Sequence, residues 1–124
     1  MECGDSFMLD DDDDTKEHLH VILTNPTPEG EVVTVAICSR HRWSETLVCL
    51  DVGDHPFVRH ASVVAYRHAK IRKCAAIEEA ITRGYARLKE RASAQLLKRM
   101  QAALIESDFV ANEVRAFFRS CDLG

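Results

Sequence analysis

The spacing of apolar residues changes near residue 73, and this change limits what the chain can fold into. Between about residues 17 and 72, apolar and β-branched residues form short runs separated by Gly and Pro, a pattern typical of strands. Beyond residue 73 the apolar residues recur every three or four positions, which is typical of amphipathic helices. Strands followed by helices in a chain of 124 residues predict one α+β domain.

The strand-like part is expected to form a small antiparallel sheet or barrel. Its first two runs flank the turn sequence N-P-T-P-E-G at residues 25–30, so we expect a hairpin with a long loop. Gly53 and Pro56 mark a later turn, because both residues interrupt strand ladders. The expected strands are residues 18–24, 31–38, 46–50 and 62–66, with a short fifth strand at 69–71.

Residues 73–124 are expected to form two or three helices that pack on the barrel. Each apolar stripe lies on one helical face and is expected to face the core. Gly84 is suited to end the first helix, and Ser107 or Asp108 is suited to cap the last. The stripes are Ile77, Ala80 and Ile81, then Leu96, Leu97, Met100, Ala103 and Leu104, then Val110, Val114, Phe117, Phe118 and Cys121.

Charge is distributed unevenly along the chain. The formal net charge is −4, but five consecutive aspartates at residues 10–14 concentrate the acidic groups near the N-terminus. Residues 18–124 are mildly basic by contrast. We interpret residues 1–16 as a solvated, disordered acidic tail in front of a barrel at residues 17–72. The alternative is that the tail mimics an anionic ligand and screens a basic surface.

Targeting and redox signals favour a cytoplasmic protein. A membrane-spanning helix needs roughly 20 apolar residues, and the apolar runs here are only a few residues long. The acidic N-terminus lacks the basic and apolar regions of a secretory signal. The chain has 5 cysteines and no C-x-x-C, which predicts reduced thiols and neither a disulfide framework nor a structural zinc site.

Histidines near the turns of the strand-like part suggest one kind of chemistry. His18 and His20 are two positions apart in an expected strand, so their side chains point to one face. Completed by His55 or His60 from another strand or turn, such a pair can bind zinc or iron. A His-ligated metalloenzyme is therefore one hypothesis.

A second hypothesis is the binding or cleavage of nucleic acid. Cations would neutralise phosphates, and Trp43 and Tyr66 could stack on bases. Metal-independent cleavage of RNA needs a base for the 2′-hydroxyl proton, an acid for the leaving oxygen and a cation for the phosphorane charge. His, Ser and Arg supply these roles. The basic residues are Arg40, Arg42, Arg59, Arg67, Lys70, Arg72 and Lys73.

Several common enzyme classes lose support because their motifs are missing. The sequence contains no G-x-S-x-G, no Walker loop, no G-x-G-x-x-G and no H-E-x-x-H. Kinase, P-loop, Rossmann and common hydrolase interpretations are therefore disfavoured, and we expect no cofactor.

The strand-like part resembles the PemK/MazF family of toxins over about residues 16–72. Residues 17–24 (E-H-L-H-V-I-L-T) are similar to the family strand R-P-A-V-V-L-S. Residues 33–39 (V-T-V-A-I-C-S) resemble its V-x-V-x-P-[ILV]-T-[ST] strand end. Residues 47–53 followed by 60–64 resemble L-x-x-G and then x-S-V-V. The resemblance implies an SH3-like barrel in the toxin of a toxin–antitoxin system.

The family resemblance also implies a homodimeric endoribonuclease that cleaves single-stranded RNA and is neutralised by a cognate antitoxin. Its Ser/Thr role carries over to Ser39, whereas His18 stands where the family has its catalytic arginine. We therefore expect His18 to transfer protons, Ser39 to contact phosphate or transfer a proton, and Arg40 with Arg59 to stabilise charge; His55 and His60 are second choices. The alternative is a catalytically degenerate barrel that binds RNA or protein.

Overall fold

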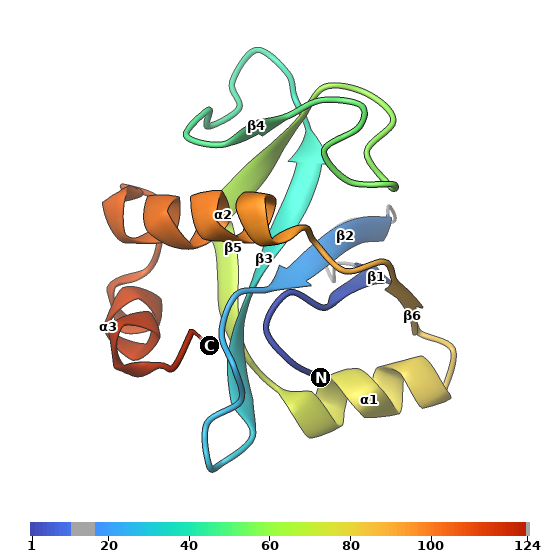
Figure 1. Cartoon of the computed structure of the whole chain (residues 1–124), viewed down its shortest axis with the longest axis vertical. Coiled ribbons are helices and arrows are strands. Elements are labelled where there is room, and N and C mark those ends of the chain that lie inside the picture. The colour runs from blue at the N-terminus through green and yellow to red at the C-terminus, as the bar shows by residue number, and fades with distance from the viewer. Residues whose placement is uncertain (11–16, 124) are drawn as a thin grey trace.

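The computed structural model describes residues 1–10 and 17–123, and it has an α+β architecture. One six-stranded sheet in the order β4-β5-β3-β2-β1-β6 is accompanied by three helices, and every strand pairing is antiparallel. Figure 1 shows the sheet curling between the helices. The elements are β1 (Ser6–Asp10), β2 (Glu17–Ile22), β3 (Glu31–Ser39), β4 (Cys49–Leu50), β5 (Ser62–Lys73), α1 (Cys74–Thr82), β6 (Ala86–Lys89), α2 (Ala94–Glu106) and α3 (Asn112–Ser120).

The sheet buries apolar residues on both faces. Alternation along β2 sends Leu19 and Val21 into a large cluster with residues of α2 and α3. Ile22, on the opposite face, joins a smaller cluster with Ile77 of α1. In Figure 1, α2 and α3 accordingly lie apart from α1, which crosses the lower end of the molecule. None of the helices in the described ranges is both long and apolar enough to cross a bilayer.

The expected hairpin is confirmed, because β2 and β3 pair in antiparallel register with Leu19 opposite Ile37. The expected strands at 62–66 and 69–71 are one strand, β5, with a register break. The strand expected at 46–50 shrinks to β4, whose two residues pair with Val63 and Ser62. The bounds of these strands depend on which strands pair with them, and a local apolar pattern does not show that pairing.

The interpretation of residues 1–16 as a disordered tail is wrong for the residues before 11. β1 lies inside the sheet between β2 and β6, and its Phe7 is completely buried. Two acidic groups that precede β1 share one cation, because the Arg91 guanidinium contacts Glu2 at 3.0 Å and Asp5 at 2.8 Å. Residues 11–16 lie outside the described residues, so a screening role for that acidic segment stays a prediction.

The helical part confirms three helices and adds a strand that the sequence reasoning missed. Gly84 follows α1 with a φ of +82°, in agreement with the expected stop. β6 pairs with β1, and so continues the sheet within the part expected to be helical. The last helix begins after Ala111, and the Ser107 hydroxyl instead accepts the Phe109 amide at 3.1 Å. The expected cap at Ser107 or Asp108 is therefore wrong.

One buried carboxylate accepts backbone amides of β5 beside its register break with β3. β3 and β5 lose their regular pairing between Thr34 and Ala36. Beside that break the amides of Tyr66 and Arg67 donate to the two carboxylate oxygens of Glu45, at 3.0 and 3.2 Å. The Tyr66 hydroxyl donates to the carbonyl of Met100 at 2.9 Å and so ties β5 to α2.

The buried phenol of Tyr66 leads us to expect that the protein loses stability at alkaline pH. Burial, and then the neighbouring Glu45, raise the pKa of its phenol above the usual value of about 10. Its stabilising contribution is therefore complete below pH 10 and is lost as pH rises beyond it, because only the unfolded chain releases the proton. We expect the free energy of unfolding to fall by about 1.4 kcal/mol per pH unit above pH 10 from this group. Urea titrations should show a smaller fall in Tyr66→Phe; an equal fall would contradict the prediction.

Candidate functional site

A groove of about 210 Å³ lies where β2 begins and β3 ends, beside the loop that precedes β5. Apolar residues form part of its lining, including Leu19 and Ile37 from the strands and Phe57 from the loop. The Lys89 ammonium lies 4.4 Å from the centre of the Phe57 ring and helps to hold that ring in place. Four of the predicted site residues border this groove: His18, Ser39, Arg59 and His60.

A short polar contact at the edge of the groove joins Ser39 to His60. The Ser39 Oγ lies 2.7 Å from the His60 Nε2, and both side chains are exposed to solvent. Either atom can donate, depending on which imidazole nitrogen holds the proton. A hydroxyl within hydrogen-bond distance of an imidazole is an arrangement suited to proton transfer at neutral pH.

Backbone contacts hold His60 in this position. The Ser62 hydroxyl donates to the His60 carbonyl at 2.9 Å. The amide of Arg40 donates to the carbonyl of Ala61 at 3.0 Å, which joins the end of β3 to the end of the loop. Ser39 is itself opposite Ser62 in the β3–β5 ladder. The proximity of Ser39 and His60 therefore follows from strand pairing and local hydrogen bonds.

His18 and Glu17 border the groove from adjacent positions of β2. Alternation along the strand places Glu17 on the face of Leu19 and His18 on the face of His20. Glu17 forms an ion pair with Arg87 of β6. Sequence reasoning missed Glu17, and its position could have been found only from the register of the hairpin.

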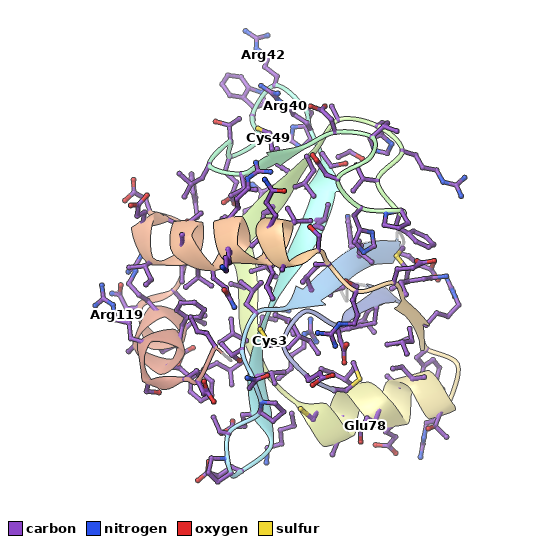
Figure 2. All side chains as sticks on the ribbon, in the orientation of Figure 1. Cys3, Arg40, Arg42, Cys49, Glu78 and Arg119 are labelled. Atoms are coloured by element: carbon purple, nitrogen blue, oxygen red, sulfur yellow. The ribbon has the colours of Figure 1, made fainter. Side chains whose placement is uncertain are left out.

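The two arginines chosen from the sequence are separated by the fold. Arg59 borders the groove beside His60, whereas Arg40 does not line it. Figure 2 shows Arg40 in the loop that follows β3 at the upper end of the molecule, with Arg42 at the outer tip of that loop. Of the pair, only Arg59 is placed to act on a ligand in the groove.

His55 lies away from the groove and braces the loop. Its Nδ1 accepts the amide of Phe57 at 3.0 Å, so the proton of a neutral ring is on Nε2. That nitrogen lies 2.8 Å from the carbonyl of Glu90, to which it donates. Because the ring is buried and both nitrogens are engaged, the structure favours a positioning role for His55 over the catalytic role expected for it.

The two aromatic residues considered for base stacking differ in exposure. Tyr66 is completely buried, so its expected contact with bases is wrong. Trp43 is 79% exposed, and the Arg42 guanidinium lies 5.1 Å from the centre of its ring. The loop that carries Trp43 is closed by two hydrogen bonds between His41 and Ser44, at 2.9 and 3.1 Å.

Metal and disulfide chemistry were both considered from the sequence. Within residues 1–10 and 17–123, no three His, Cys, Asp or Glu side chains are grouped as metal ligands would be. The histidines of the metalloenzyme hypothesis are divided between the groove, the loop brace and the buried stack of His20 on Phe7. No disulfide joins the cysteines, all of which lie in the described residues.

Comparison of the chain with models of known protein families finds no match, and comparison with curated protein sequences finds none either.

Proposed function

We propose that the protein is a metal-independent endoribonuclease that cleaves single-stranded RNA in the groove between β2, β3 and the loop before β5. The observation that carries this proposal is the 2.7 Å contact of Ser39 with His60, with Arg59 bordering the same groove. These are the residue types that RNA cleavage by the adjacent 2′-hydroxyl requires.

The chemistry assigns both proton transfers to His60. It takes the 2′-hydroxyl proton, the 2′-oxygen attacks the neighbouring phosphorus, and the bond to the 5′-oxygen breaks. The departing 5′-oxygen then takes its proton from the His60 imidazolium, because alternation along β2 directs the His18 side chain to the face of His20 and away from that of Leu19. Arg59 stabilises the extra negative charge on the phosphorane. Ser39 orients the His60 ring through their hydrogen bond. The products are a 2′,3′-cyclic phosphate and a 5′-hydroxyl, so no water is consumed.

The wider proposal is a divergent PemK/MazF-like toxin with an SH3-like barrel. It is supported by a curled antiparallel sheet followed by helices, and by Ser39 at the end of β3 where the resemblance expects a Ser or Thr. A homodimer and a cognate antitoxin belong to the same proposal. Growth arrest on expression, relieved by Ser39→Ala, would support it; growth unaffected by the active protein would contradict it.

The exposed Trp43 supports a second candidate, a barrel that binds RNA without cleaving it. An aromatic ring beside a guanidinium is a suitable platform for an unpaired base. Trp43 is the only tryptophan of the chain, so its fluorescence reports contacts at this loop alone.

A single experiment separates the two candidates. We expect a long single-stranded RNA to be cut into discrete fragments by the purified protein, equally with and without EDTA, and Trp43 fluorescence to be quenched. Quenching without cleavage would identify the binding module. Cleavage abolished by EDTA would contradict the metal-independent mechanism, and intact RNA without quenching would contradict both candidates.

A further inference from the structure

The apolar part of the groove between β2, β3 and the loop before β5 suits the flat face of a nucleobase. Leu19 and Ile37, which stand opposite each other in the β2–β3 ladder, both line it. Phe57 adds a half-buried aromatic ring, and its amide is held by the His55 Nδ1 at 3.0 Å. A base has apolar faces and polar edges, and unpaired bases commonly pack on aromatic side chains. The groove therefore offers a base a fixed aromatic contact.

One polar side of the groove is a carboxylate. Alternation along β2 puts Glu17 on the face of Leu19, two positions past the end of the β2–β3 ladder. Ser39 stands two positions beyond Ile37 in β3, past the same end of the ladder and on the same face. Glu17 and Ser39 therefore border the groove from neighbouring strands.

The ion pair of Glu17 with Arg87 holds this carboxylate on the β1 side of the groove. Arg87 belongs to β6, which is separated from β2 by β1 (Figure 1). Neighbouring strands are about 4.8 Å apart, so β2 and β6 are about 10 Å apart. Met8 of β1 stands opposite both Leu19 and Arg87 and also lines the groove. The carboxylate and the hydrogen-bonded Ser39 thus lie on different sides of one apolar space.

We infer that this groove selects guanine and that Glu17 is the residue that recognises it. Guanine alone among the four RNA bases has two adjacent donors on its Watson–Crick edge, N1–H and the N2 amino group. A carboxylate accepts such a pair with its two oxygens, and its remaining lone pairs leave room for Arg87. Adenine, cytosine and uracil each place an acceptor beside their donor, which a carboxylate repels. The ion pair also offsets the charge that would otherwise repel the RNA backbone.

This inference rests on the proposed ribonuclease function and makes it more specific. The guanine belongs to the nucleotide whose 2′-hydroxyl attacks, because its base lies in the groove beside the Ser39–His60 contact. Cleavage is therefore expected on the 3′ side of guanosine. Base selection is a property of binding, so it can be measured separately from cleavage.

A binding series tests the selection of guanine. The probes are labelled oligouridylates that differ only in one central nucleotide, which carries no 2′-hydroxyl and so cannot be cut there. Fluorescence anisotropy with the full-length protein should show roughly tenfold tighter binding for central guanine than for adenine, cytosine or uracil. Inosine lacks the N2 amino group and should bind about three- to tenfold more weakly than guanine. Replacing guanine by 7-deazaguanine leaves the Watson–Crick edge intact and should change the affinity by less than about twofold. Equal affinity for the four bases, or no binding, would overturn the inference.

Matched variants identify the residue that recognises the base. Glu17→Gln puts an amide donor where guanine needs an acceptor, so the preference for guanine over adenine should fall to about threefold or less while adenine binding stays unchanged. Glu79→Gln removes another exposed carboxylate that is paired with an arginine, Arg83, outside the groove, and should leave the preference unchanged. Circular dichroism verifies that both variants are folded. A preference retained in Glu17→Gln, or an equal loss of affinity for every base, would overturn the role of Glu17.

Mapping of the cleavage products separates this inference from the ribonuclease proposal. The fragments of a long single-stranded RNA should end in guanosine 2′,3′-cyclic phosphate. Selective binding of guanine without cleavage would contradict the ribonuclease and support the selection of guanine by the groove. Cleavage after all four bases alike would overturn the selection of guanine and leave the ribonuclease proposal standing.

Discussion

Replacement of His60 by alanine is expected to lower the rate of RNA cleavage by about 10²–10⁴-fold, the usual contribution of a positioned acid or base. The reason is that its Nε2 lies 2.7 Å from the Ser39 Oγ at the edge of the groove, where no other described side chain makes that contact. The measurement is single-turnover cleavage of an end-labelled single-stranded RNA. Because His60 is exposed, the variant should remain folded.

The control for His60 is another exposed histidine. His68 of β5 does not line the groove, so His68→Ala should leave the cleavage rate within a factor of two of that of the unmodified protein. Ser39→Ala should lower the rate as well, and the double variant should lose less than the product of the two effects, because the residues act as a unit. Retention of full activity in His60→Ala would contradict the assignment, and Trp43 quenching would show whether RNA still binds.

Glu45→Ala is expected to lower the free energy of unfolding by about 1–3 kcal/mol. The carboxylate accepts the amides of Tyr66 and Arg67, where β5 departs from its register with β3. Removing it leaves the buried amide of Tyr66 without an acceptor, which costs about 1–3 kcal/mol. The amide of Arg67 is only partly buried, so water can replace its lost partner. Urea unfolding monitored by circular dichroism measures the difference.

Two further substitutions show whether the Glu45 effect arises from its hydrogen bonds. Glu45→Gln keeps one carbonyl acceptor and should lose about half as much stability as Glu45→Ala. Glu29→Ala removes an exposed carboxylate from the turn between β2 and β3 and should change stability by no more than about 0.5 kcal/mol. A loss in Glu45→Ala no larger than in Glu29→Ala would show that the two amides find other partners.

The sequence predicted those features that local patterns determine. The β2–β3 hairpin follows from two β-branched runs around a turn, and the three helices follow from apolar stripes at helical spacing. The strand β6 was missed because its four residues are too few for a periodic pattern, and because its pairing with β1 is a long-range contact. The run of aspartates led to the interpretation of the N-terminal segment as a solvated tail, although the strand just before it buries Phe7.

The candidate site was predicted in part for the same reason. Ser39 was selected at a strand end, and the β3–β5 register then places it opposite Ser62, two residues after His60. Residue types alone ranked His55 with His60, although the fold buries the first as a brace and exposes the second. The role of Glu45 was not foreseen, because it depends on a register break that sequence periodicity does not reveal.

The interior position of β1 has a consequence for how the chain folds during synthesis. Ser6 pairs with Lys89, and Arg91 then contacts the carbonyl of Cys3 at 2.8 Å. During synthesis β1 therefore lacks one neighbour until residues near 91 have emerged from the ribosome. Contacts of such high sequence separation slow folding, because the entropy of closing a long loop is lost before the contacts can stabilise the chain. Until then the nascent chain exposes an unpaired strand edge, the kind of surface that chaperones protect from aggregation.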